Sequence, residues 1–112
     1  MNVSEEQVND TLILAPVGRL DSTTSPEFEK LLLPKVDGAS ARVILDLGQL
    51  DYISSAGLRV VLMAAKRAKQ SSGSFALCGL QENVREVFEI SGFLSILTVC
   101  GTRDEALAAV TA

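Results

Sequence analysis

Two adjacent serines, Ser54 and Ser55, lie in the stretch "DYISSAGLRVVL" (residues 51–62), which begins as a strand and ends as a helix. A hydroxyl at the start of a helix can cap it, act as a nucleophile, contact a ligand or accept a phosphate. Capping alone would explain a serine here, because its oxygen can accept a free N–H of the first turn and stabilise the helix by about 1 kcal/mol. The other roles depend on what the rest of the chain can bring to these serines.

Catalysis by these serines lacks its usual partners. The chain contains no histidine, so a Ser-His-Asp triad cannot form, and the G-x-S-x-G pattern is absent around Ser55. The first lysine after Ser55 is Lys66, eleven residues further on, which is about three helical turns. Two distant cysteines without a histidine do not suit zinc, and no Gly-rich phosphate-binding loop is present. We therefore expect no enzyme, no metal and no cofactor.

An aspartate or a bound small molecule offers an alternative to serine chemistry. Asp46 comes late in the apolar stretch 41–47, as the phosphorylated aspartate of a receiver domain would. A receiver also needs an acidic pair at the end of its first strand to hold magnesium, and "LILAPVGRL" (12–20) contains none. A nucleotide could bind at the same sheet edge as the serines, but no residue pattern indicates a site for a base or a ribose. Both alternatives are weaker than a protein-binding function.

Composition indicates a single cytoplasmic domain. The 112 residues suffice for one hydrophobic core. A net charge of −4 and scattered basic residues argue against nucleic-acid binding, which needs clustered lysine and arginine. Cys78 and Cys100 lie in apolar, strand-like surroundings and are expected to be buried thiols. The acidic start "MNVSEEQVND" is unlike a signal peptide, and every apolar run is far shorter than the roughly 20 residues of a membrane span.

Hydrophobic patterning predicts the element order β-β-α-β-α-β-α-β-α. Strands are predicted over residues 2–8, 11–20, 41–47, 74–80 and 94–99. The strand at 41–47 is apolar almost throughout, which is typical of a parallel sheet buried on both faces. We expect an α/β fold with a mostly parallel sheet, an antiparallel edge strand at 2–8 and four helices.

Capping residues and prolines predict where the helices begin and end. Ser25 is the expected N-cap of the first helix and Pro26 its first residue, and Pro34 should bend or end this helix before Gly38. Thr102 is the expected N-cap of the last helix.

The predicted sheet brings a second polar segment to the serines. Asp21 and Ser22 follow the strand 11–20, and parallel strands place them at the same carboxyl edge as Ser54 and Ser55. Partners usually bind α/β proteins at this edge. The unpaired N–H groups of the helix start would also accept a phosphate on a first-turn serine.

Small residues, Ala56 and Gly57, open the helix after the serines. Glycine in a helix costs about 1 kcal/mol relative to alanine, so Gly57 indicates close approach by another backbone or side chain. Either a partner or another element of the domain could make this approach, and the position of Gly57 directly after the turn with the candidate serines favours a partner.

Taken in order, "VGRLDSTTSPEFEKLL", "VILDLGQLDYISSAGLRVVLMAAKRAK" and "FALCGLQENVREVFEISGF" resemble the STAS domain, specifically the bacterial anti-sigma factor antagonists. The resemblance covers almost the whole chain. In the family pattern D-S-[ST/A]-G-L, the phosphoacceptor position corresponds to Ser55. Asp21 corresponds to an acidic residue that helps to engage a kinase. Ser54 stands where the family usually has aspartate, which leaves Ser54 as a second, less favoured acceptor.

The resemblance implies a partner-switching mechanism rather than an enzyme. The unphosphorylated protein would bind an anti-sigma factor that is also a GHKL-type serine kinase, and a sigma factor would be released. The kinase would then phosphorylate Ser55 and break the complex, and a PP2C-type phosphatase would reverse this. The partner-binding residues would be Asp21, Ser22, Ser54, Ala56 and Gly57.

The alternative is a STAS subunit that binds partners without phosphorylation, as in a lipid-transport ATPase complex, or a domain of an anion transporter. The S-x-G-L opening favours the switch.

Overall fold

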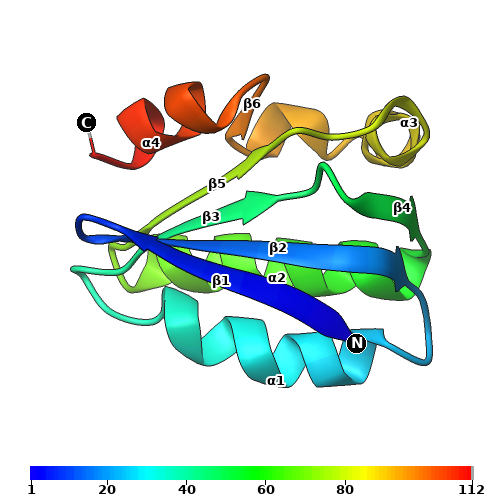
Figure 1. Ribbon diagram of the computed structural model, residues 1–112, viewed down its shortest axis with the longest axis horizontal. Helices are drawn as coiled ribbons and strands as arrows, with labels where there is room; N and C mark the ends of the chain where they lie inside the picture. The colour runs from blue at the N-terminus through cyan, green and yellow to red at the C-terminus, as the bar shows by residue number, and fades with distance from the viewer. Residues whose placement is uncertain (112) are drawn as a thin grey trace.

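The computed structural model describes residues 1–111 and shows an α/β fold with one mixed sheet (Figure 1). The strands are β1 (Asn2–Val8), β2 (Thr11–Leu20), β3 (Arg42–Asp46), β4 (Leu50–Ile53), β5 (Ser74–Cys78) and β6 (Val99–Cys100). The helices are α1 (Ser25–Val36), α2 (Ser55–Gln70), α3 (Glu82–Ser91) and α4 (Arg103–Thr111), with a short 3-10 helix, η1 (Leu94–Ile96).

The sheet has the order β1-β2-β3-β5-β6, and β4 pairs with β2 outside this path. β1 runs antiparallel to β2, whereas the pairs β2–β3, β2–β4, β3–β5 and β5–β6 are parallel. The predicted mostly parallel sheet with an antiparallel edge strand at 2–8 is therefore confirmed.

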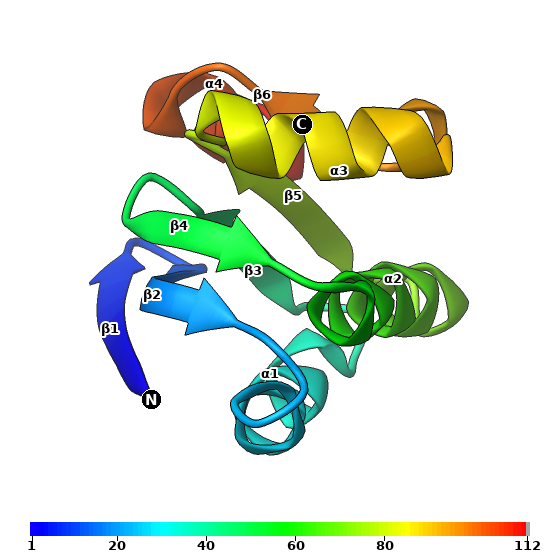
Figure 2. The same ribbon diagram turned by 90° about the vertical axis from the view of Figure 1, so that its right-hand side faces the viewer.

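Helices cover both faces of the sheet, as the apolar strand at 41–47 predicted (Figures 1 and 2). Alternate residues of β3 point to opposite sides: Val43 and Leu45 join the core beneath α1 and α2, and Ile44 joins a second core that includes Ala106 and Val110 of α4. α3 packs against β4 near the carboxyl end of the sheet. Two helix layers thus leave the carboxyl ends of β2 and β4 at one side of the molecule.

Strand β4 was not counted as a separate strand in the predicted element order. β3 ends at Asp46, and the chain turns through a hydrogen bond from Leu50 N to Leu47 O of 3.1 Å. It then re-enters the sheet as β4 beside the last residues of β2, with Leu20 opposite Ile53. The strand-like start of "DYISSAGL" is this strand.

The strand predicted over residues 94–99 is wrong. Leu94–Ile96 form the 3-10 helix, and only Val99 and Cys100 pair with β5. Leu94 and Leu97 pack against the core while Ile96 is 69% exposed, so the apolar residues of this run do not share one buried strand. The first hydrogen bond to β5, from Leu77 N to Thr98 O, comes only at the end of the run.

The start of α1 also differs from the prediction. Ser25 is not the N-cap: it is the first helical residue, Thr24 precedes it as the N-cap, and Pro26 stands one position later than expected. The reason lies in the preceding loop, where the carbonyl of Asp21 accepts the Ser25 N–H at 2.9 Å and starts the helix early. Pro34 lies inside α1, which ends at Val36.

Two predictions about side chains in the fold are confirmed and one is confirmed in part. Thr102 caps α4, because its Oγ1 accepts the backbone N–H of Glu105 at 3.1 Å. Cys78 is a buried free thiol, and burial raises its pKa to about 11. Cys100 is also free but only partly buried.

Candidate functional site

The carboxyl ends of β2 and β4 lie side by side and carry the polar segments that the sequence singled out (Figure 2). Leu20 and Ile53 are opposite each other in the two strands, and the Ser54 N–H donates a hydrogen bond of 2.8 Å to the Leu20 carbonyl. Asp21 follows Leu20 directly, and Ser54 follows Ile53. The predicted meeting of these two segments at one sheet edge is therefore present in the fold.

Ser54 caps helix α2. Its side-chain oxygen accepts the Gly57 N–H at 3.3 Å, and its carbonyl accepts the Leu58 N–H at 2.9 Å. The backbone at Ser54 is extended (φ −93°, ψ 176°), as expected for an N-cap, and the residue is partly buried. Capping therefore explains a serine at position 54, whose Oγ is the acceptor.

Ser55 differs from its neighbour in both exposure and bonding. It is the first residue of α2 and is exposed. Within residues 1–111 its hydroxyl makes no hydrogen bond. Of the two adjacent serines, only Ser55 presents a free hydroxyl to solvent.

Asp21 organises the loop between β2 and α1. Its Oδ1 accepts the backbone N–H groups of Thr23 at 3.0 Å and Thr24 at 3.1 Å, and Arg19 lies 3.7 Å from its Oδ2. The bonds from Thr24 and then Thr23 favour the charged form and lower the pKa of Asp21. Asp21 is thus held as a carboxylate in a fixed position beside the start of α2.

The close approach that the sequence predicted at Gly57 is present, and it is internal. Gly57 is buried, and a Cβ built there would lie 2.9 Å from Leu20 Cβ, from the Leu20 carbonyl oxygen and from Ile53 Cγ1. A side chain at this position would collide with the ends of both strands. Packing within the domain therefore explains the glycine. A partner backbone at this position, which the sequence favoured, is not required to explain it.

A shallow groove of about 220 Å³ runs between the first turns of α1 and α2. Its lining brings together Ser22 and Ala56, two of the predicted partner-binding residues. The other residues that line it are Ser25, Pro26, Glu29, Lys30, Arg59 and Val60. The hydroxyl of Ser25 is buried and has no hydrogen-bond partner within the described chain.

Sequence reasoning missed Arg19 and Tyr52 at this edge. The Arg19 guanidinium lies 4.1 Å from the centre of the Tyr52 ring, and 38% of Tyr52 is exposed. The pairing of Arg19 with Tyr52 in β2 and β4 is what brings them together. Arg19 and Tyr52 lie far apart in the sequence, so their contact could be predicted only from the pairing register of β2 with β4.

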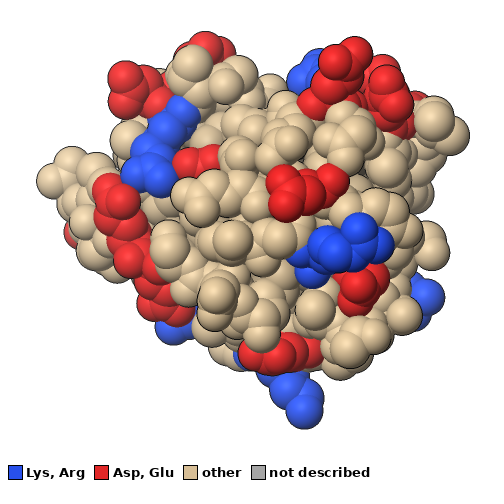
Figure 3. Space-filling model, turned by 45° about the vertical axis from the view of Figure 1, so that its right-hand side comes forward, with Lys and Arg blue, Asp and Glu red and all other residues tan. Residues whose placement is uncertain are grey.

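The surface around this edge mixes both signs of charge (Figure 3). Acidic side chains gather at the upper right of that view over α3, whose exposed residues include Glu82, Glu86 and Glu89. Asp51 of β4 is also exposed and lies within 3.4 Å of Gln81 Nε2. A partner at this edge would meet separate acidic and basic side chains rather than one uniform field.

Asp46, the residue considered for a receiver-type site, has a structural role in this fold. Its Oδ2 accepts a hydrogen bond of 2.9 Å from Arg103 Nη2, and its Oδ1 accepts the Gly48 N–H at 3.0 Å. Arg103 also binds Glu6 Oε1 at 3.0 Å. This ion-pair network ties α4 to β3 and β1.

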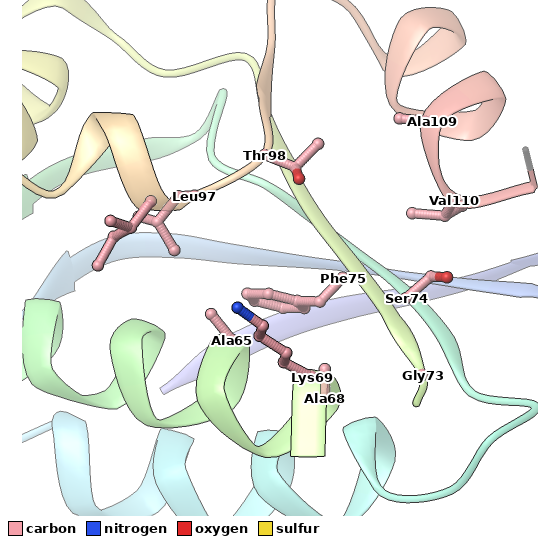
Figure 4. A pocket seen from close by; sticks show the side chains of 11 residues that line it. Ala65, Ala68, Lys69, Gly73, Ser74, Phe75, Leu97, Thr98, Ala109 and Val110 are labelled. Atoms are coloured by element: carbon pink, nitrogen blue, oxygen red, sulfur yellow. The ribbon is translucent and has the colours of Figure 1, made fainter. Parts of the chain in front are cut away.

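A larger hollow, of about 310 Å³, lies away from the serines (Figure 4). Lys69 of α2, Phe75 of β5 and Leu97 face it, and Val110 of α4 closes one side. It is built at the amino end of β5, whereas the serines follow the carboxyl end of β4. The predicted small-molecule alternative concerned the serine edge, where the shallow groove of about 220 Å³ lies.

Comparison with known proteins agrees with this architecture. The model of the STAS domain family matches residues 2–106. The chain belongs to the STAS domain family. This STAS domain is 49% identical over 109 residues to BtrV of Bordetella bronchiseptica, a protein named as an anti-sigma factor antagonist, with 97% of this chain and 94% of BtrV covered.

Solved structures show the same fold. A protein of Thermotoga maritima named as an anti-sigma factor antagonist superposes with a TM-score of 0.89 at 25% identity, covering 98% of this STAS domain and 95% of that chain. SpoIIAA of Bacillus matches in its phosphorylated form with a TM-score of 0.70 at 21% identity, covering 96% of this chain and 97% of that chain. Among residues 1–111, none of the helices has the length and apolar character needed to cross a membrane.

Proposed function

We propose that this STAS domain is an anti-sigma factor antagonist whose binding is switched by phosphorylation at Ser55. The unphosphorylated protein binds an anti-sigma factor with GHKL-type serine kinase activity in the cytoplasm, and a sigma factor is released. Phosphorylation by that kinase dissolves the complex, and a PP2C-type phosphatase restores it. The domain itself acts by binding and catalyses no reaction.

The difference between the two serines carries the assignment of the acceptor. Ser54 is partly buried, and its Oγ accepts the Gly57 N–H in the helix cap. Ser55 is exposed, and its hydroxyl makes no hydrogen bond within residues 1–111. A kinase must bring the attacking hydroxyl into line with the γ-phosphate of ATP, so an accessible and unbonded hydroxyl is the better acceptor. This geometric argument supports the same residue as the family pattern.

The chemistry of the edge supports a charge-based switch. A phosphoserine carries about −1.5 to −2 charges at pH 7. It would stand beside the carboxylate of Asp21, which the loop hydrogen bonds hold in place. A partner surface that packs closely against this edge would then face a concentrated negative charge without any change in the fold. The name of the relative BtrV and the phosphorylated form of SpoIIAA support this proposal.

Phosphorylation mapping tests the proposal. The wild-type protein, Ser55→Ala and Ser54→Ala are each incubated with the cognate anti-sigma kinase and ATP, and the phosphopeptides are located by mass spectrometry. We expect phosphate on Ser55 in the wild type and in Ser54→Ala, and none in Ser55→Ala. Phosphate only on Ser54, Ser22 or Thr23 would refute the assignment. A partner that binds tightly but transfers no phosphate would favour the phosphorylation-independent STAS subunit.

A further inference from the structure

Arg59 differs from the other arginines of the chain. Of the six arginines, five have a carboxylate within 4.0 Å, and Arg59 has none within residues 1–111. The five pairs are Arg19–Asp21, Arg42–Asp10, Arg67–Asp37, Arg85–Glu89 and Arg103 with both Glu6 and Asp46. The exposed guanidinium of Arg59 is therefore a positive charge without an internal partner.

The position of Arg59 on α2 directs it toward Ser55. The two residues are four apart in one helix and both are exposed. Side chains four apart on a helix are neighbours, with about 5–6 Å between their Cβ atoms. Long side chains in a helix also lean toward its N-terminus, so Arg59 covers the turn that contains Ser55 and Ala56. Its place in the groove lining beside Ala56 agrees with this direction.

The neighbouring charges leave room for such a contact. From α1, Glu29 and Lys30 line the same groove; within residues 1–111 Glu29 forms no ion pair with Arg59, and Lys30 carries the same positive charge. The carboxylate of Asp21 is already bonded to the loop and paired with Arg19. A phosphate on Ser55 would place an anion one turn before Arg59. A helix is stabilised when the anion precedes the cation in this way.

We propose that Arg59 is a binding residue with two roles: it binds the phosphate on Ser55 after phosphorylation, and it contacts a carboxylate of the partner before phosphorylation. The second role rests on the function proposed above. An arginine binds a phosphate with two parallel N–H···O bonds, which also fixes the geometry. Phosphorylation then changes the partner-facing surface twice, because it adds a negative charge and withdraws a positive one.

The first role can be tested without a kinase. Phosphoserine is incorporated at position 55 during translation, and its second ionisation is followed by ³¹P NMR in the full-length chain. In the wild type the guanidinium favours the dianion, so the phosphate pKa should lie below that of Arg59→Gln by about 0.2–0.4 unit, as expected from pair strengths on helices. Arg59→Lys should fall between them. Arg67→Gln, on the same helix and about three turns after Ser55, is the matched control and should leave this pKa unchanged.

Equal phosphate pKa values in the wild type and Arg59→Gln would overturn the first role.

For the second role, the affinity of the unphosphorylated protein for the anti-sigma kinase is measured. Arg59→Gln should weaken binding by about tenfold, as truncated charge pairs in interfaces do, and Arg67→Gln should not. Unchanged affinity would overturn the second role. A kinase that never phosphorylates Ser55 would refute the proposed function, and the NMR result would still decide the pairing.

Discussion

The backbone N–H of Ser54 donates a 2.8 Å hydrogen bond to the carbonyl oxygen of Leu20. This bond extends the pairing of β2 with β4, in which Leu20 lies opposite Ile53, and it holds the residue before α2 against the residue before Asp21. Ser54 caps α2 from this position, and Ser55, the first residue of the helix, is exposed.

The stabilities of serine variants should reflect these roles. Ser54→Ala removes the bond to Gly57 N–H and should lower the free energy of unfolding by about 1 kcal/mol. Ser55→Ala removes an exposed, unbonded hydroxyl and should change it by less than about 0.5 kcal/mol. Urea unfolding of both variants and the wild type measures the difference. Equal losses in the two variants would contradict the capping assignment.

Charge at Ser55 should control partner binding. Ser55→Ala should bind the anti-sigma kinase as the unphosphorylated protein does, whereas Ser55→Asp should bind at least about tenfold more weakly because like charges meet in the interface. Ser55→Asn is the matched control, with the same size but no charge. Binding is measured by calorimetry at two salt concentrations. Equal affinities of the Asp and Asn variants would show that charge at this position does not act on the partner.

Gly57→Ala should destabilise the fold, although alanine is the better helix former. The added methyl meets Leu20 and Ile53 at 2.9 Å, and such overpacking costs about 1–3 kcal/mol. The gain in helix propensity of about 1 kcal/mol offsets only part of this cost. Ala56→Gly in the same turn reports propensity alone. Thermal unfolding distinguishes the two effects, and a clearly more stable Gly57→Ala would mean that the strand ends yield easily to the methyl.

Asp21 should stabilise the protein only while it is ionised. Its pKa is lowered in the folded state, so its contribution is fully present above its ordinary pKa of 3.8 and is lost as the pH falls through the lower, folded value. Asp21→Asn should therefore be less stable than the wild type at pH 7, and the difference should shrink at pH 3. Glu86→Gln, on the exposed face of α3, is the control. A difference that is the same at both pH values would show that the charge of Asp21 is unimportant.

The sequence predicted most of the fold because its strongest patterns are local. Apolar strands such as 11–20 and 41–47, and the cap at Thr102, depend on nearby residues and were predicted correctly. The run 94–99 was misassigned because its composition suits a strand, while its neighbours let only Val99 and Cys100 reach β5. Which of its residues are buried depends on α3 and the core, and no local pattern records this.

The candidate site shows the same division. Motif position pointed to Ser55, and sheet topology placed Asp21 at the same edge. Packing inside the domain requires a glycine at position 57 because Leu20 and Ile53 lie opposite each other in β2 and β4. A single sequence does not show which residues of two strands are paired. Arg59 escaped notice because its significance comes from what the other five arginines do, and their carboxylate partners are known only in three dimensions.

The two ends of the described chain lie on different sides of the molecule, which affects how the protein can be handled (Figure 1). The amino group of Met1 lies 3.2 Å from Glu27 in the first turn of α1, and β1 begins beside the last residues of β2, with Asn2 opposite Val17. Val110, near the end of α4, lies by the hollow at the amino end of β5. An affinity tag or surface anchor attached before β1 would therefore emerge near the carboxyl end of β2 and could interfere with affinities measured at the serine edge. Immobilisation through the end of α4 leaves that edge open to its partner.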